Sequence, residues 1–142
     1  MDFLTLILRL IISIFLCGVL GFERQVHNRP LGIRTNALVG LGATLITVVT
    51  LELIAQYPTM AFNPAFLILA IIPGIGFMGS GIIYKTGESV VGLTTAATLW
   101  VTAALGLIIG LGYYFEAIVV TILTLFILLF FKKIEEWLAK KK

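Results

Sequence analysis

The sequence predicts an all-α, polytopic membrane protein, a bundle of about five transmembrane helices in one domain spanning residues 1–142. Three observations support this fold class. Hydrophobic residues make up 60% of the chain and charged residues only 12%, about half the charged share of an average soluble domain. The mean hydropathy is +1.12. Long apolar runs recur without the two-residue alternation of a membrane β-barrel, so helices are the spanning elements.

Each predicted span has roughly the 20 apolar residues that a bilayer requires. The stretch 93–131 is too long for one span, and it divides at 110–114, where two glycines precede interfacial aromatic residues. The predicted helices are residues 3–21, 36–53, 65–84, 93–111 and 114–131. We expect the first to be a retained helix, because it has neither the positive segment nor the cleavage site of a signal peptide.

Basic residues predict the orientation of the bundle. They lie in the connections after the first and third helices and in the tail 132–142, whereas the connection 55–64 and the turn after the fourth helix have none. This alternation and the positive-inside rule place the N-terminus outside and the C-terminus in the cytoplasm. For the tail, the sequence is equally compatible with a short interfacial helix and with a frayed end after the last span.

The densest polar segment is the connection after the first helix. It holds the candidate residues for binding a partner or ligand: Glu23, Arg24, Gln25, Arg29, Arg34 and Thr35. Arginines beside a glutamate favour bidentate pairing or anion capture. An orientation signal in contact with lipid headgroups is supported almost as well. His27 has no second histidine or cysteine nearby, so no metal site is predicted.

Small residues in the third and fourth helices are candidates for helix packing or for a transport pathway: Gly76, Ser80, Thr94, Thr98, Gly106 and Gly110. The GxGxxG spacing at 74–79 lies inside an apolar span, which excludes a dinucleotide site. Pro73 favours a packing kink over a broken helix that lines a site. In the fourth helix, small residues at every fourth position predict a face for another helix, with a hydrophilic path as the alternative.

Two charges near the apolar runs are unusual. Arg9 lies inside the first helix, where a charge needs a partner. It either pairs with Glu52, at the end of the second helix on the same side, or extends to the outer headgroups. No catalytic or metal-binding set of residues stands out, so neither an enzyme nor a bound metal or cofactor is predicted. Basic residues flank apolar runs, so a nucleic acid is not an expected partner.

Four blocks of the sequence, in matching order, resemble the signature of the MgtC/SapB family. The resemblance covers residues from about 10 to 131. The four blocks are 21–25 (GFERQ), 29–39 (RPLGIRTNALV), 73–81 (PGIGFMGSG) and 92–100 (GLTTAATLW). The resemblance implies a bacterial inner-membrane protein, associated with growth in low magnesium and with virulence inside phagocytes. Family members resemble regulators of other membrane systems, including the F-type ATP synthase, more than proven magnesium transporters. The resemblance also carries Gly32 into the polar candidate set, and it adds Gly79, Gly81, Thr95 and Trp100 to the candidates for packing or a pathway in the third and fourth helices.

The chain departs from the family pattern in two respects. Phe66, Ala70 and Val91 stand where relatives usually have an arginine, a glutamine and an arginine, which removes a set of polar contacts. Because the chain ends at Lys142, we expect a short form without the soluble ACT-like C-terminal domain of longer members.

The sequence therefore favours a non-enzymatic regulator that binds membrane partners within the lipid bilayer. Two glycine-rich faces favour a homodimer, and other membrane proteins are further candidate partners. The alternative is a small transporter or channel for Mg²⁺ or another ion, and a lipid-binding scaffold is a third hypothesis. A Mg²⁺ path needs carboxylates, whereas helices two to four offer threonines and glycines at mid-depth.

Overall fold

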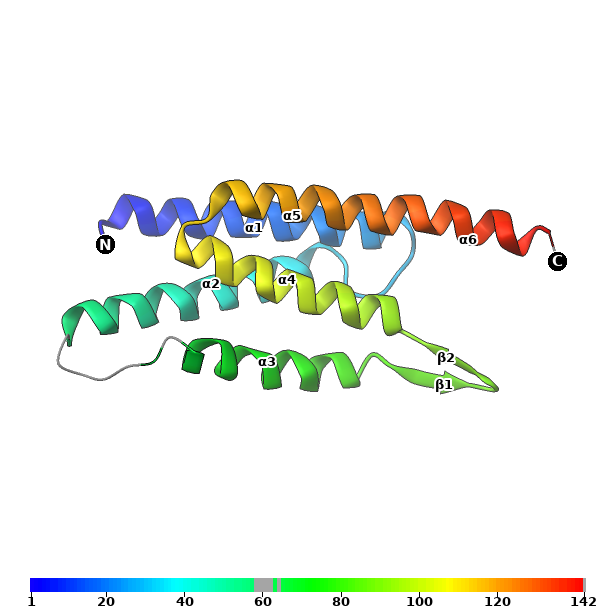
Figure 1. Cartoon of the computed structure of the whole chain (residues 1–142), viewed down its shortest axis with the longest axis horizontal. Helices are drawn as coiled ribbons and strands as arrows, with labels where there is room; N and C mark the ends of the chain where they lie inside the picture. Colours follow the sequence, from blue (N-terminus) through cyan, green and yellow to red (C-terminus); the bar gives the residue numbers. More distant parts are fainter. Residues whose placement is uncertain (58–62, 64, 142) are drawn as a thin grey trace.

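The computed structural model describes residues 1–57, 63 and 65–141 and shows a helical bundle with one β-hairpin (Figure 1). The last three helical segments follow one another without a break and form a single helix. In chain order the elements are α1 (Phe3–Val26), α2 (Ile33–Gln56), α3 (Ala65–Ser80), β1 (Tyr84–Thr86), β2 (Ser89–Val91), α4 (Leu93–Leu111), α5 (Tyr114–Phe126), the π-helical segment η1 (Ile127–Phe131) and α6 (Lys132–Ala139).

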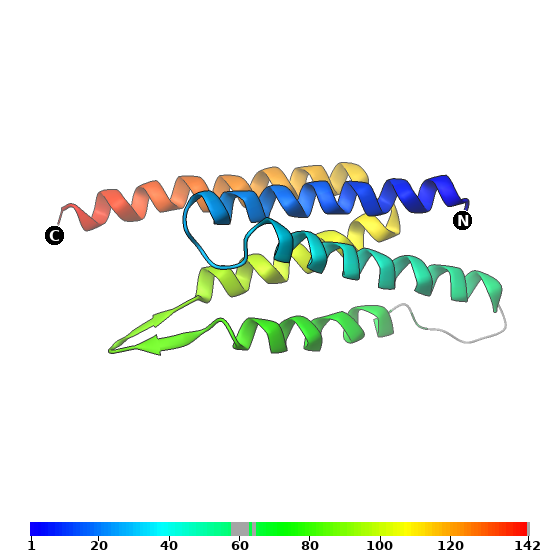
Figure 2. The ribbon, with the colours of Figure 1, turned by 180° about the vertical axis from the view of Figure 1, so that it is seen from behind.

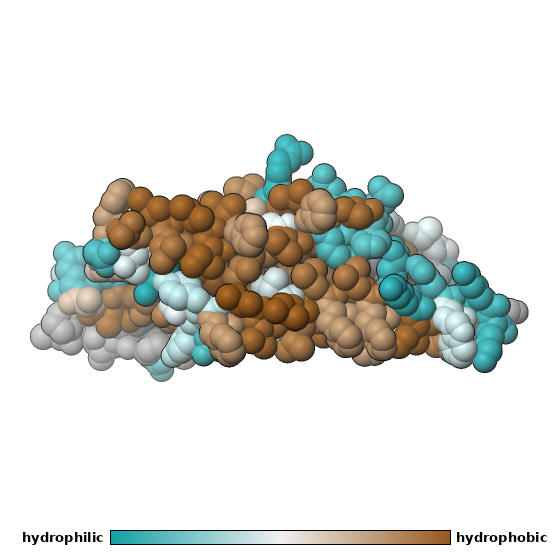
Figure 3. All heavy atoms as spheres, turned by 90° about the horizontal axis from the view of Figure 1, so that it is seen from above, coloured by the Kyte–Doolittle hydropathy of each residue, from teal (hydrophilic) through white to brown (hydrophobic). Residues whose placement is uncertain are grey.

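Among the described residues, four helices are long and apolar enough to cross a membrane: α1, α2, α4 and the continuous helix Tyr114–Ala139. Helix α3 is apolar but has 16 residues, about 24 Å at 1.5 Å per residue. Figure 3 shows apolar side chains over the middle of the molecule and hydrophilic ones gathered toward its two ends. The predicted all-α polytopic membrane fold is confirmed.

The two ends of the bundle carry different elements (Figures 1 and 2). One end has the α1–α2 loop (residues 27–32), the β1–β2 hairpin and α6, and we call it the arginine end. The opposite end has the N-terminus, the end of α2 and the turn between α4 and α5. The basic connections and the basic tail thus lie at one end, while the side of the membrane that each end faces stays a prediction. The connection 55–64 and Lys142 lie largely outside the described residues.

Five predicted helix ends differ from those of the structure. Helices α1 and α2 continue beyond the apolar runs to residue 26 and from residue 33, because hydropathy marks the embedded part while helical hydrogen bonding continues into polar residues. The fifth helix likewise continues through the tail to Ala139. The third helix was predicted to reach residue 84 but ends at Ser80, because glycines on both sides of Ser80 disfavour helix and the residues that follow favour a strand.

The β-hairpin after α3 was not predicted. Its strands pair antiparallel, with Tyr84 opposite Val91 and Thr86 opposite Ser89. Gly87 occupies the two-residue loop with φ +61°, a conformation that glycine adopts readily in tight hairpin turns. The hairpin leads directly into α4 and therefore sets where that helix begins.

Helices α1, α2 and α4 form the inner core, with α5 against α1 and α4, and α3 mainly against α4. Glycines bring the backbones of α2 and α4 together. A Cβ on Gly106 would collide with the carbonyl oxygen of Gly40, and one on Gly110 would lie 2.5 Å from Thr47 Cβ. The small-residue face of α4 therefore lies against α2 within one chain.

Buried hydroxyl groups in this core bond to each other and to backbone carbonyls. Thr44 Oγ1 lies 2.8 Å from both Ser13 Oγ and the Gly106 carbonyl oxygen. Thr102 Oγ1 lies 2.8 Å from Asn36 Oδ1. These bonds connect α1, α2 and α4, and they satisfy polar groups that would be unfavourable in a dry core.

Candidate functional site

The last turn of α1 buries an ion pair at the arginine end. Glu23 and Arg24 are each 5% exposed, and Arg24 Nε donates to Glu23 Oε2. His27 Nδ1 lies 3.1 Å from Glu23 Oε1. A buried carboxylate is tolerated only when it is paired, so the guanidinium of Arg24 stabilises Glu23 in this position.

The loop after α1 is held closely against the helix that precedes it. Asn28 and Leu31 have positive φ angles of 52° and 63°, a conformation that is uncommon outside glycine. Gln25 Oε1 accepts a hydrogen bond from the Ile33 N–H, 3.3 Å away, at the start of α2. Asn36 Nδ2 donates to the Leu31 carbonyl oxygen at 2.5 Å. Gln25, predicted as a binding residue, thus supports the loop.

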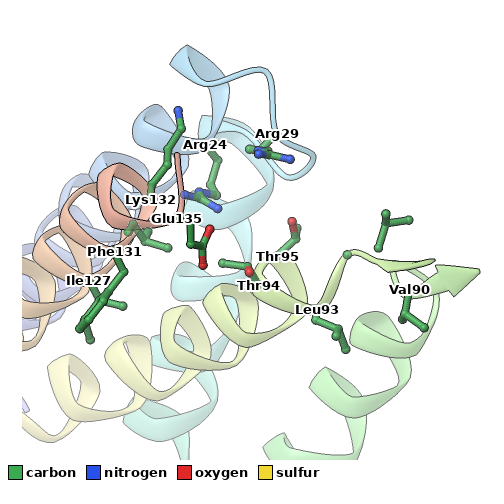
Figure 4. A pocket seen from close by; sticks show the side chains of 13 residues that line it. Arg24, Arg29, Val90, Leu93, Thr94, Thr95, Ile127, Phe131, Lys132 and Glu135 are labelled. Atoms are coloured by element: carbon green, nitrogen blue, oxygen red, sulfur yellow. The ribbon is translucent and has the colours of Figure 1, made fainter. Parts of the chain in front are cut away.

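A cavity of about 500 Å³ opens at the arginine end, between the end of α1, the start of α4 and the last helix (Figure 4). Its volume lies within the range of small-molecule sites. Polar and charged side chains of Arg24, Arg29, Thr94, Thr95, Lys132 and Glu135 line it, together with Val90, Val91, Gly92, Leu93, Ile127, Leu128 and Phe131.

Helix α4 begins at this cavity without a capping side chain from the described part of the chain. Its N-cap is Gly92, with φ +92°. A Cβ there would collide with the Ile82 carbonyl oxygen, so glycine is required where the hairpin meets the helix. The first N–H groups of a helix have no intrahelical acceptor, and the first three residues of α4, Leu93, Thr94 and Thr95, line the cavity.

The cavity joins residues that the sequence placed in two separate candidate sets. Arg24 and Arg29 come from the predicted binding loop, and Thr94 and Thr95 from the predicted packing or pathway set. Arg34 and Thr35 begin α2 and are not among the lining residues.

Lys132 and Glu135 also line the cavity, although sequence analysis did not select them. The one sequence signal for them was the basic tail, whose predicted side matches that of the arginine loop. Val91, which replaces an arginine of the family pattern, lines the same wall.

The glycines of α3 do not all pack as predicted. A Cβ on Gly76 would have no described atom within 4 Å, so Gly76 does not receive a helix of the same chain. Gly79 instead faces α4, with its added Cβ 3.7 Å from Ala96 Cβ, and Ser80 Oγ donates to the Phe77 carbonyl oxygen at 2.7 Å. Helix α3 passes through Pro73 without interruption.

The remaining α3 and α4 candidates have other surroundings. Gly81 is exposed in the turn after α3. Trp100, 51% exposed, lines a small apolar cavity between α3 and α4. Thr98 is buried and donates to the Thr94 carbonyl oxygen at 2.8 Å, within its own helix.

Arg9 and Glu52 do not pair with each other, whereas the extension of Arg9 to the outer headgroups stays a prediction. Arg9 Nη1 donates to the Gly110 carbonyl oxygen at 2.5 Å, and its Nε donates to Tyr114 Oη at 3.3 Å. The last carbonyls of a helix lack amide partners and attract cations, so Arg9 stabilises the end of α4. Glu52 pairs with the N-terminal ammonium of Met1 at 2.5 Å.

In the described ranges, no group of three or more histidine, cysteine, aspartate or glutamate residues has the arrangement of a metal site. Close packing in the core and open polar groups at the arginine end define a class, a multi-pass α-helical membrane protein with a polar cavity at one end. In a comparison of the sequence with protein families, the family model described as "MgtC family" matches residues 10–137. This chain belongs to that family.

Two relatives illustrate the similarity. The Escherichia coli (strain K12) protein named "Putative magnesium transporter YhiD" is 36% identical over 138 residues, which cover 95% of this chain and 64% of that protein. "Protein MgtC" of Salmonella typhimurium (strain 14028s / SGSC 2262) is 40% identical over 119 residues, which cover 84% of this chain and 49% of that protein. The chain thus spans about half to two thirds of the length of these relatives. Neither name describes an enzyme, and no solved structure matches the chain.

Proposed function

We propose that this chain is a non-enzymatic regulator in the bacterial inner membrane that acts by binding membrane partners through its arginine end. We also propose that the regulator is linked to magnesium, because the Escherichia coli relative is named a putative magnesium transporter. The positive-inside rule favours an arginine end in the cytoplasm and an N-terminus outside. A role in virulence and a homodimer stay predictions.

The observation that carries this proposal is the contrast between the core and the arginine end. In the core, Gly40 and Gly106 bring two backbones into contact, and the Thr44 hydroxyl bonds across three helices. A conducting path needs polar groups beside open space along the membrane depth. Here a polar cavity of about 500 Å³ lies at one end, which is the arrangement expected of a binding protein.

A second candidate is a small transporter or channel for Mg²⁺ or another ion, favoured by the name of the Escherichia coli relative. Mg²⁺ is usually held by carboxylates and water. Glu23 already pairs with Arg24, and Glu52 pairs with the N-terminal ammonium. These pairings favour the regulator over a Mg²⁺ conductor.

Reconstitution of the purified chain in liposomes that enclose a Mg²⁺-sensitive dye separates the two functions. We expect Mg²⁺ entry to equal that of protein-free liposomes. Saturable entry that depends on the protein would overturn the regulator and support transport.

The binding half of the proposal is tested in bacterial membranes with a photo-cross-linking amino acid. It is placed at Lys133, exposed on α6 at the arginine end, or at Phe115, exposed at the opposite end. We expect one membrane protein, identified by mass spectrometry, to cross-link from position 133 and not from position 115. Equal cross-linking from both ends, or none from position 133, would contradict partner binding at the arginine end.

A further inference from the structure

We propose that the cavity at the arginine end binds a phosphate-bearing group, carried by an anionic phospholipid headgroup or present as free phosphate. This proposal goes beyond partner binding and does not depend on it. It rests on two buried residues whose unbonded donor atoms face the cavity, on the start of α4, and on the charges of the lining side chains.

Two buried side chains direct unused donors into the cavity. Thr95 is 5% exposed, and its hydroxyl makes no hydrogen bond with any described residue. The Arg24 side chain is 6% exposed. Its Nε is engaged with Glu23, whereas its two Nη groups make no bond with the part of the chain that the structure describes. Figure 4 shows both side chains at the cavity, with the Glu135 carboxylate drawn between the Arg24 guanidinium and Thr94. The donor atoms of Thr95 and Arg24 are open to the cavity, so an acceptor from outside the chain can reach them.

The start of α4 supplies a second set of donors at the same place. The backbone N–H groups of Leu93, Thr94 and Thr95 lie at the positive end of a 19-residue helix, which attracts anions. Its first turn contains no acidic residue. Neither a capping side chain nor an acidic residue of the first turn of α4 therefore occupies the start of this helix among the described residues, although the carboxylate of Glu135 lines the same cavity.

The charges of the lining side chains also favour an anion. Among the lining side chains, Arg24, Arg29 and Lys132 carry three positive charges against the one carboxylate of Glu135. Outside the lining, Glu23 pairs with Arg24, and Glu136 lies 3.9 Å from Lys132. One guanidinium group can donate two parallel hydrogen bonds to two phosphate oxygens, and an ammonium group adds a point charge. Glu135 lies on the same wall as Lys132 and repels an anion, so its removal should strengthen binding.

The shape of the cavity fits more than a bare phosphate. Its volume of about 500 Å³ exceeds what a single phosphate fills, and its other wall is apolar. Ile127, Leu128 and Phe131 lie beside the polar groups on the last helix. A headgroup that continues into an acyl chain would use both walls, whereas free phosphate would use only the polar wall.

Binding is measured with the full chain in phosphatidylcholine nanodiscs. In one arm, inorganic phosphate is titrated by calorimetry. In the other, the discs contain phosphatidylglycerol, and native mass spectrometry measures the affinity of the retained lipid. We expect Arg29→Gln and Lys132→Gln each to weaken binding about fivefold, since each removes a charge-assisted hydrogen bond. Lys133→Gln is the matched control, because it removes the same charge from the neighbouring position of α6, which does not line the cavity.

Two further variants test the mechanism more sharply. Thr95→Val keeps the side-chain shape and removes the unused hydroxyl, so binding should weaken about threefold while the α-helical circular dichroism stays unchanged. Glu135→Gln should tighten binding about fivefold by removing the opposing charge, whereas Glu88→Gln, on the hairpin and outside the cavity, should not.

The two arms distinguish the source of the phosphate group. If inorganic phosphate binds and the variants change its affinity as predicted, the ligand is free phosphate. If phosphatidylglycerol is retained with the same changes in affinity and inorganic phosphate does not bind, the ligand is a headgroup. The proposal is overturned if neither ligand binds, if Lys133→Gln weakens binding as much as Lys132→Gln, or if Glu135→Gln fails to tighten it. Neither arm measures ion flux or protein cross-linking, so its failure is distinct from failure of the regulator.

Discussion

Gly106→Ala tests whether the backbones of α2 and α4 are as close as the structure shows. The added Cβ would collide with the Gly40 carbonyl oxygen and lie 2.9 Å from Ala43 Cβ. Because the first obstacle is backbone, a side-chain rotation cannot relieve it. The matched control is Gly42→Ala, also within a helix, where an added Cβ meets no described atom within 4 Å.

The expected magnitude follows from what the two variants share. Each replaces a helical glycine with alanine, which favours the helix by about 0.5–1 kcal/mol, and this term cancels in the comparison. The overpacking term of about 1–3 kcal/mol remains for Gly106→Ala alone. Since about 1.4 kcal/mol changes an equilibrium tenfold, opening of the core should become roughly 5- to 150-fold more frequent.

The only cysteine of the chain reports this opening. Cys17 is fully buried, and its Sγ lies 3.8 Å from the Thr102 carbonyl oxygen in the core. A thiol reagent reaches it only after local opening, and its rate follows the opening equilibrium when closing is fast. We expect Gly106→Ala to react about 5- to 150-fold faster than Gly42→Ala in the same detergent. Equal rates would refute the close contact of α2 with α4.

Three other predictions follow from particular contacts, and a fourth follows from the predicted orientation. Arg9→Met should destabilise the chain by about 1–3 kcal/mol in detergent unfolding, because the Gly110 carbonyl loses its partner. Glu52→Gln should change stability by less than about 0.5 kcal/mol, because its pair is half-exposed and screened. Thr44→Val should destabilise by about 0.6–1.7 kcal/mol through lost bonds between helices. In intact bacteria, an impermeant thiol reagent should label Phe115→Cys directly, and Lys133→Cys only after membrane disruption.

Each of these predictions has a result that contradicts it. If Glu52→Gln lowers stability as much as Arg9→Met does, the result would support the Arg9–Glu52 pair, one of the two alternatives drawn from the sequence. Thr50→Val controls for Thr44, since Thr50 bonds only to the Ile46 carbonyl of its own helix. Equal losses would show that the bonds between helices contribute nothing. Labelling of position 133 in intact cells would contradict the predicted orientation and place the arginine end outside.

Hydropathy was sufficient to predict the helices because lipid requires both apolar residues and internally bonded backbones. It was insufficient where tertiary contacts decide. The hairpin has three-residue strands, too short for a pattern to emerge. The acceptor of Arg9 is the backbone carbonyl of Gly110, which no side-chain pattern reveals. The spacing of Gly76 and Ser80 identified a small-residue pair but not whether a neighbour faces it.

The candidate site was predictable only in part, for a related reason. The arginine loop and the threonines of α4 were each selected from local sequence, but their meeting depends on the folded geometry. Gly92 must turn the hairpin into α4, and the last helix must continue past its apolar run to bring Lys132 and Glu135 alongside. Neither condition leaves a periodic signal in the sequence.

The distribution of satisfied and unsatisfied donors separates what holds the fold from what is free to bind. At mid-depth, Thr44 and Thr102 bond to other helices, so their polarity is used in assembly. At the arginine end, the Thr95 hydroxyl makes no such bond, although Thr95 is buried as deeply as Glu23. Thr98 and Thr102 bond to carbonyls four residues earlier in α4, whereas Thr95 lies in the first turn and has no helical carbonyl at that position. The start of α4 therefore leaves the Thr95 hydroxyl available to a ligand, as the proposed phosphate site requires.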